Sequence, residues 1–81
     1  MIEMQEDTYK AIFMDVFGVD EKELGEAFNF GTAPGWDSFA HMELIAQLED
    51  HFDILLDTED ITHFGGYENG KKILGKYGVI I

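Results

Sequence analysis

The chain has 81 residues, contains 17 Asp or Glu against 5 Lys or Arg, and carries a formal net charge of −12. This length supports one domain with a small core, and the excess of negative charge disfavours direct binding to nucleic acid or to an anionic membrane surface. Because there is no Cys, disulfides, thiolate metal sites and cysteine nucleophiles are all excluded.

The spacing of apolar residues predicts a first helix over Glu3–Phe17, which we expect to end at Gly18. Residues 18–36 then form a long connection, and Asp20 with Glu23 predicts a short capped helical turn near its start. Long connections in compact domains usually pack against the core or have a function. The apolar side chains expected to anchor this one are Val19, Leu24, Phe28, Phe30 and Trp36.

A second, strongly amphipathic helix is predicted over Ser38–Phe52. The side chains expected to form its buried stripe are Met42, Ile45, Leu48 and Phe52. Two further apolar residues and two carboxylates lie along one edge of that stripe, namely Phe39, Ala46, Glu43 and Asp50. The apolar arc is wider than core packing requires, so we expect its far edge to be exposed between acidic residues.

Two more helices are predicted in the C-terminal third of the chain. The acidic turn at Asp57–Asp60 opens a brief helix that ends near Phe64, and Gly65 and Gly66 interrupt the chain after it. A last helix is expected over Tyr67–Tyr77, with an inward face formed by Ile73, Leu74 and Tyr77. Each internal glycine weakens this helix by up to about 1 kcal/mol relative to Ala; these glycines are Gly70 and Gly75.

No strand pair is predicted, and the apolar tail Val79–Ile81 is expected to pack back onto the helices. The predicted fold is all-α: a small antiparallel bundle of three main helices plus one short third helix, with a long loop between helices 1 and 2, in a single domain over residues 1–81. The N-terminal sequence lacks the features of a signal peptide, and no apolar run is long enough to span a membrane. We therefore expect a monomer in the cytoplasm.

Positive charge is absent from the middle of the chain. No Lys or Arg lies between Glu23 and Gly70, and this segment holds 11 of the 17 acidic residues. Such a surface either keeps a small protein in solution or attracts basic partners through complementary potential. Charge alone favours the simpler of these explanations, which is solubility.

The residues that can carry chemistry lie where the second helix begins, in the segment Asp37-Ser38-Phe39 that follows a Gly-Trp pair. Asp and Ser are both favoured helix N-caps, so either residue can serve only to satisfy backbone N–H groups. His41 follows Ser38 by about one helical turn, but no third group that would orient it is evident. A small hydrolase built on this pair is therefore disfavoured, and we expect His41 to be a surface or half-buried residue.

The wider pattern resembles the acyl carrier protein family, in which Asp-Ser-Leu opens an acidic amphipathic helix that ends in Glu-rich sequence and Phe. The matching residues of this chain are Asp37, Ser38, Phe39, Glu43, Glu49, Asp50 and Phe52. Length, the long first loop, the short acidic third helix and the last helix also agree. The Trp-Asp-Ser sequence, Phe39, Ala46 and the Gly-rich last segment depart from the main fatty-acid carriers. The Trp-Asp-Ser sequence looks more like that of specialised stand-alone carriers.

The resemblance implies that a phosphopantetheinyl transferase, using coenzyme A and Mg²⁺, attaches a 4′-phosphopantetheine arm to the Ser38 hydroxyl. The terminal thiol of the arm would hold acyl cargo as a thioester, which suits a chain without Cys. A phosphodiester is also favourably placed at a helix N-terminus. Asp37 is expected to cap the helix, to take part in recognition by the transferase, or both. The implied function is that of a non-catalytic carrier in fatty-acid, polyketide or related synthesis.

The resemblance also implies docking to synthase and cargo-loading enzymes that have basic patches. Apolar side chains on the helix would fit a shallow groove while carboxylates meet Lys or Arg. Each exposed pair contributes under about 1 kcal/mol, so binding should be transient and weakened by salt. The candidate partner face comprises Phe39, Met42, Glu43, Ala46, Glu49 and Asp50. A core position for Met42 and a merely solvated face for the last two acidic residues are the alternatives.

Two other functions stay open: an aminoacyl or peptidyl carrier of the same fold, and an unmodified acidic protein-interaction module. No metal site is predicted. Residues 57–68 superficially resemble a calcium-binding loop, but Thr62 occupies the sixth position, where such loops need Gly, and Ile61 occupies the fifth. An acidic helix cap followed by a turn explains this segment better.

Overall fold

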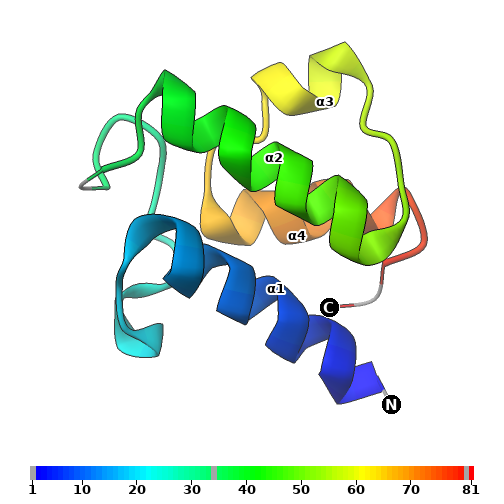
Figure 1. The fold of residues 1–81 in the computed structure, drawn as a ribbon, viewed down its shortest axis with the longest axis horizontal. Helices are drawn as coiled ribbons and strands as arrows, with labels where there is room; N and C mark the ends of the chain where they lie inside the picture. Colours follow the sequence, from blue (N-terminus) through cyan, green and yellow to red (C-terminus); the bar gives the residue numbers. More distant parts are fainter. Residues whose placement is uncertain (1, 34, 80) are drawn as a thin grey trace.

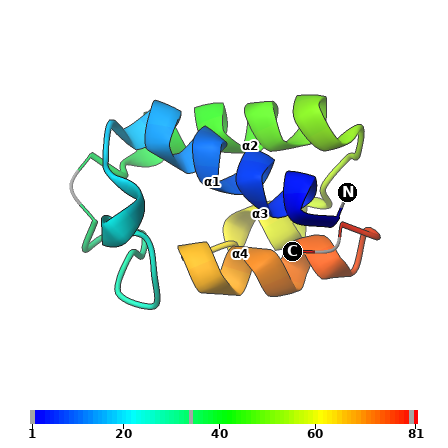
Figure 2. The same cartoon turned by 90° about the horizontal axis from the view of Figure 1, so that it is seen from below.

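The computed structural model describes residues 2–33, 35–79 and 81, which form a small helical bundle (Figure 1). Its elements are α1 (Ile2–Phe17), the 3-10 helix η1 (Glu21–Glu23), α2 (Ser38–Phe52), α3 (Thr58–Thr62) and α4 (Tyr67–Gly75). Helix α1 runs antiparallel to α2 and α4, and the short α3 lies beside α2 and α4 (Figures 1 and 2). The predicted all-α bundle, with its long loop between the first two helices, is confirmed.

Most predicted helix boundaries agree with the structure to within one or two residues. Helix α1 begins one residue before the predicted Glu3, and it ends where Gly18 adopts a φ of 65° and donates its N–H to the Met14 carbonyl at 2.8 Å. The capped turn is present as η1, where the Glu23 carboxylate accepts from the Asp20 N–H at 3.4 Å. Helices α3 and α4 end two residues earlier than predicted, because their last turns tighten into i→i−3 hydrogen bonds.

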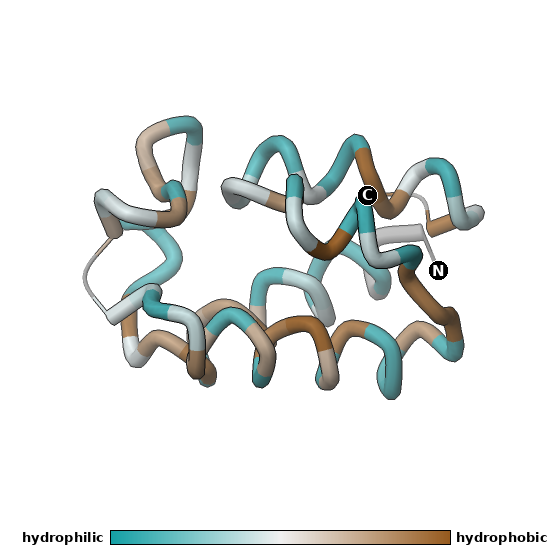
Figure 3. Tube along the Cα trace, turned by 90° about the horizontal axis from the view of Figure 1, so that it is seen from above, coloured by the Kyte–Doolittle hydropathy of each residue, from teal (hydrophilic) through white to brown (hydrophobic). Residues whose placement is uncertain are grey.

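The core is built from aliphatic and aromatic side chains on α1, α2, α4 and the connecting segments. Its largest fully buried side chains are Tyr9, Phe13, Leu44, Leu48, Phe64 and Leu74. Hydrophobic and hydrophilic segments alternate along the helices (Figure 3), as expected when each helix buries one face. The tail packs back as predicted at Val79, which is buried, and Ile81, which is half-buried, whereas Ile80 lies outside the described residues. Among the described residues, no helix has the length and apolar character to cross a bilayer.

The buried stripe of α2 differs from the predicted one along one edge. Ile45 and Leu48 are buried and Phe52 is half-buried, but Leu44 is fully buried as well, whereas Met42 is 55% exposed. Around a helix, Met42 and Leu44 lie on opposite sides of Leu48. The core covers the Leu44 side, so of the two interpretations of Met42, core residue or member of the partner face, the core position was wrong.

Apolar side chains anchor the long connection between α1 and α2 to the core. Phe28 and Trp36 are each 4% exposed, and Val19 and Leu24 are half-buried against the core, as predicted. Phe30 is 49% exposed, so it is not buried in the core as an anchor would be. Its ring contacts those of Trp36 and His41 at centroid separations of 6.3 and 5.7 Å, and its backbone also ties the connection to a distant segment.

Backbone hydrogen bonds tie the connection to the junction between α3 and α4. Phe30 donates its N–H to the Gly65 carbonyl at 2.8 Å, and Tyr67 donates to the Phe28 carbonyl at 3.0 Å. Between these bonds, Asn29 and Gly66 form an isolated antiparallel bridge. A Cβ at position 66 would collide with the Asn29 side chain, which would have to move to make room for it. The bridge joins two short segments far apart in the chain, which is why no local pattern predicted it.

A polar network holds α3 to the end of α4. Asp60 accepts from Lys76 Nζ at 2.7 Å and from the Tyr77 hydroxyl at 2.6 Å, and that hydroxyl accepts from the Asp57 N–H at 3.0 Å. The hydrogen bond from Lys76, followed by the one from Tyr77, lowers the pKa of the Asp60 carboxyl. Helix α3 is therefore fixed along the side that faces α4.

Two glycines of α4 provide a test of core packing. Gly70 is buried, and a Cβ there would meet the Phe64 ring and the Tyr9 hydroxyl, whereas nothing lies near a Cβ at Gly75. We predict that Gly70→Ala lowers the free energy of unfolding by about 1–3 kcal/mol, as overpacking does. The control Gly75→Ala should leave stability unchanged or raise it by up to about 1 kcal/mol. Urea denaturation followed by circular dichroism measures both, and equal stability of the two variants would contradict this packing.

Candidate functional site

Helix α2 begins at a capped turn that exposes a hydroxyl. Asp37 is the N-cap, because its Oδ1 accepts from the Ala40 N–H at 2.9 Å and its carbonyl accepts from the His41 N–H at 2.9 Å. Ser38 is the first residue of the helix, and its side chain is exposed. Of the two caps that the sequence allowed, the structure uses Asp37. The exposed Ser38 hydroxyl has no hydrogen-bond partner among the described residues.

The start of α2 also offers backbone donors to an anion. The first N–H groups of a helix have no acceptor within it, and in α2 the capped turn satisfies the N–H of Ala40 and that of His41. The N–H groups of Ser38 and Phe39 come before these two, at the positive end of the helix dipole. An anionic group bonded to the Ser38 hydroxyl would be stabilised by both features.

Trp36 fixes the point from which the chain enters α2. Its buried ring contacts the rings of Phe13, Phe17 and Phe28 at centroid separations of 5.7, 4.9 and 5.7 Å. Aromatic pairs at such separations contribute beyond the area that they bury. Ser38 therefore follows, by two residues, an anchor that is held by α1 and by the long connection.

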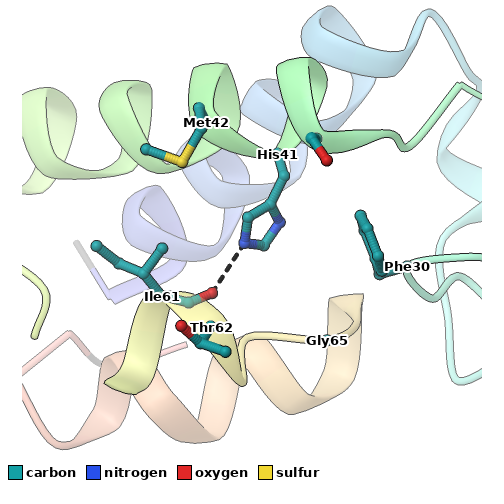
Figure 4. Close-up of a pocket in the computed structure, with 7 residues that line it drawn as sticks. Phe30, His41, Met42, Ile61, Thr62 and Gly65 are labelled. Carbon is teal, nitrogen blue, oxygen red and sulfur yellow. Dashed lines mark hydrogen bonds between the residues drawn. The ribbon is translucent and has the colours of Figure 1, made fainter. Parts of the chain in front are cut away.

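His41 is half-buried, as expected, and hydrogen bonds engage both of its ring nitrogens. Trp36 Nε1 donates to His41 Nδ1 at 3.0 Å, and His41 Nε2 lies 2.8 Å from the Ile61 carbonyl oxygen of α3 (Figure 4). An indole N–H can only donate, so Nδ1 is the acceptor and Nε2 carries the proton that is donated to Ile61. The view that no group orients His41 was therefore wrong. Neither nitrogen is bonded to Ser38, so nothing supports a hydrolase built on this pair.

A cleft of about 280 Å³ opens beside Ser38, between α2, α3 and the long connection. Its lining residues are Phe30, Ser38, His41, Met42, Ile61, Thr62 and Gly65. Figure 4 shows Met42 of α2 on one side of the cleft and Ile61 and Thr62 of α3 on the other. The Met42 side chain, for which a core position was the alternative, therefore contributes to the surface next to the exposed hydroxyl.

Most residues of the predicted partner face are exposed on α2. Phe39 is 79% exposed and Met42 is 55% exposed. The other exposed members are Glu43, Ala46 and Asp50. Glu49 differs because it is half-buried and its Oε2 accepts from the Leu56 N–H at 3.0 Å. Five of the six residues are thus accessible, and Glu49 also holds the segment that follows α2.

Leu55 is an exposed apolar residue that the sequence analysis missed. It is 81% exposed, although the next residue, Leu56, is buried. It borders a shallow hollow whose other lining residues are Ala46, Glu49, Asp50, Asp53 and Ile54. The run of three aliphatic residues after α2 could have indicated this exposure. Neighbouring side chains of an extended segment point to opposite sides, so the three cannot all face the core.

The acidic residues of α2 are not neutralised by ion pairs within the described part of the chain. The ion pairs found there are Lys10–Glu21, Lys71–Glu6, Lys71–Glu68 and Lys76–Asp60. None of them involves α2 or its N-cap. The same residues contain no group of three or more side chains able to hold a metal ion.

A family model described as a phosphopantetheine attachment site matches residues 9–67. This segment runs from α1 to the start of α4, so it includes Ser38, its cap, the cleft and α3. No solved structure matches the chain significantly.

Two substitutions separate the capping role of Asp37 from any role of its charge. Asp37→Asn keeps a side-chain oxygen that can accept from the Ala40 N–H, so the free energy of unfolding should change by less than about 0.5 kcal/mol. Asp37→Ala removes the acceptor and should lower that free energy by about 0.5–2 kcal/mol. Thermal or urea denaturation measures both, and an Asp37→Ala variant as stable as the parent would show that the cap does not contribute.

Proposed function

Because the chain belongs to the phosphopantetheine-attachment family, we propose that it is a carrier protein with a 4′-phosphopantetheine arm on Ser38. One observation carries this assignment: Ser38 is the only serine of the chain, and it lies exposed at the capped start of α2 within the matched segment. When attached, the arm supplies the thiol that holds cargo as a thioester, which a chain without Cys cannot provide itself.

The surroundings of Ser38 fit such an arm in two respects. The N–H groups at the start of α2 and the helix dipole favour the negative charge of a phosphodiester. The adjoining cleft, bordered by Met42 and Ile61, offers apolar surface to the part of the arm nearest the attachment point. Its volume of about 280 Å³ is near the lower end of small-molecule sites, roughly 300–1,000 Å³. The cleft in this form suits part of the arm or a short cargo.

The chain needs no catalytic group at Ser38 for this function. A transferase would remove the hydroxyl proton and form the bond from Oγ to phosphorus as the nucleotide portion of coenzyme A leaves. His41 does not compete for the base role, because both of its ring nitrogens are bonded elsewhere. We therefore propose a non-catalytic carrier that is the substrate of a phosphopantetheinyl transferase.

The docking surface that we propose lies along α2 and the segment after it, and comprises Phe39, Met42, Glu43, Ala46, Asp50 and Leu55. Exposed apolar side chains become buried on contact, while unpaired carboxylates attract Lys and Arg of a basic enzyme. Exposed ion pairs contribute little individually, so such complexes exchange quickly. This suits a monomeric cytoplasmic carrier that visits the transferase, cargo-loading enzymes and synthases in turn.

The cargo that we propose is an acyl group of fatty-acid, polyketide or related synthesis. The alternative is an aminoacyl or peptidyl group, because the Trp-Asp-Ser sequence before α2 resembles specialised stand-alone carriers. Supplying the modified protein to acyl-loading and aminoacyl-loading enzymes, and identifying the thioester by mass, distinguishes the two classes.

Modification of Ser38 is tested by incubating the purified protein with coenzyme A and a broad-range phosphopantetheinyl transferase. The intact mass should rise by one phosphopantetheine in the parent protein and should not rise in Ser38→Ala. Thr58→Ala is the matched control, since Thr58 is also the first residue of a helix and follows an Asp N-cap; it should be modified like the parent. No gain by the parent, while a known carrier is modified in parallel, would favour an unmodified interaction module. A gain by Ser38→Ala would show that Ser38 is not the attachment residue.

Removal of charge from α2 tests the docking surface. Glu43→Gln and Asp50→Asn should each lower kcat/KM of the transferase by up to about fivefold at low salt, since an exposed ion pair contributes up to about 1 kcal/mol. The difference should vanish at high salt, where exposed charges are screened. Asp7→Asn and Asp15→Asn, at exposed positions of α1, provide controls of equal charge. Equal losses in both pairs would indicate an effect of net charge rather than docking at α2.

A further inference from the structure

The two hydrogen bonds of His41 coexist only when its ring is neutral. Nδ1 accepts from Trp36 Nε1 at 3.0 Å, and Nε2 donates to the Ile61 carbonyl at 2.8 Å. A protonated imidazole carries hydrogen on both nitrogens, and an indole nitrogen can only donate. Protonation would therefore place an N–H on His41 Nδ1 directly opposite the N–H of Trp36 Nε1, and the hydrogen bond from Trp36 would be lost.

The ring that has to move in this case is that of His41. Trp36 is 4% exposed and is enclosed by three aromatic rings, whereas His41 is half-buried and borders the cleft. Both nitrogens belong to one rigid ring, so a swing of that ring away from Trp36 also draws Nε2 from the Ile61 carbonyl. That bond is the one hydrogen bond between α2 and α3 in the described part of the chain.

Among the described residues, no carboxylate forms a hydrogen bond or an ion pair with the His41 ring. The rings around it are those of Phe30, Trp36 and Phe64, at centroid separations of 5.7, 6.1 and 6.3 Å. Three charged or titratable residues on the elements packed against it are engaged elsewhere: the Asp37 carboxylate by Ala40, the Asp60 carboxylate by Lys76 and Tyr77, and His63 by the Glu59 carbonyl. The Glu59 carboxylate of α3 is exposed to solvent and has no bond to His41. Hydration of the cation therefore favours an outward swing of the ring.

We infer that His41 is a pH-sensitive latch, and that its protonation releases α3 from α2 and opens the cleft beside Ser38. The network around Asp60 keeps α3 attached to α4, so the latch changes the cleft without unfolding the bundle. Histidine side chains change charge between about pH 5 and pH 8, a range in which most carboxylates stay ionised. For an attached arm, the consequence would be a wider cleft in mild acid, and this part rests on the proposed function. The latch itself does not depend on the arm, because it is formed by residues of the unmodified chain.

The test is an NMR titration of the unmodified protein from about pH 8 to about pH 5.5, within the range in which histidine titrates. The Trp36 indole N–H signal and the backbone signals of α3 should shift with the same midpoint as the His41 ring, while circular dichroism shows the helices retained. The titration is run on His63→Gln protein, because the His63 ring is itself bonded to the Glu59 carbonyl of α3. Adding His41→Gln should abolish these shifts, because its amide can accept from Trp36 and donate to Ile61 but does not titrate. His51→Gln, at an exposed position of the same helix, should keep them.

The His41 tautomer gives a second measurement that needs no variant. Ring ¹⁵N shifts of the parent protein should show the proton on Nε2 at the alkaline end of the titration. A proton on Nδ1 would overturn the latch, as would a Trp36 signal that does not follow His41, or shifts that persist in His41→Gln. Because every sample is unmodified, these results are independent of whether a transferase acts on Ser38.

Discussion

The burial of the Trp36 indole is the interaction on which the rest of the site depends. Rings from α1 and the long connection enclose it, so the chain enters α2 from a fixed point and Asp37 can cap the helix immediately. The outward-facing edge of the same indole holds His41, and His41 holds α3. One buried side chain thus sets the position of the Ser38 hydroxyl, the start of the helix dipole and one wall of the cleft.

The charged side chains of the described residues lie at the surface, outside the packing around Trp36. The cations that form ion pairs contact residues of α1, η1, α3 and α4, whereas the carboxylates of α2 repel one another without a paired cation in the described residues. In a chain of 81 residues with a net charge of −12, this repulsion opposes folding. The same unpaired carboxylates, together with exposed apolar side chains of α2, form the surface at which we propose that a basic enzyme docks.

Features that depend on local sequence were predictable, and features that depend on distant contacts were not. The bounds of α1 and α2, the capped turn at Asp20 and the exposed hydroxyl at the start of α2 follow from capping residues and helical periodicity. Whether Met42 or Leu44 enters the core depends on where other helices lie. The same is true of the exposure of Phe30, whose backbone pairs with a segment far along the chain. The tautomer of His41 could not be inferred because its partners come from the loop and from α3.

The most direct test of the central claim, that this small bundle presents one modifiable hydroxyl from a rigid helix start, is NMR of the protein before and after treatment with transferase and coenzyme A. The expected shift changes are large at Ser38 and Phe39 and extend along the cleft to Met42 and Ile61, while core residues such as Phe13 stay unchanged. An unmodified product, obtained while a known carrier is modified in parallel, would contradict the claim. So would shift changes spread through the whole core.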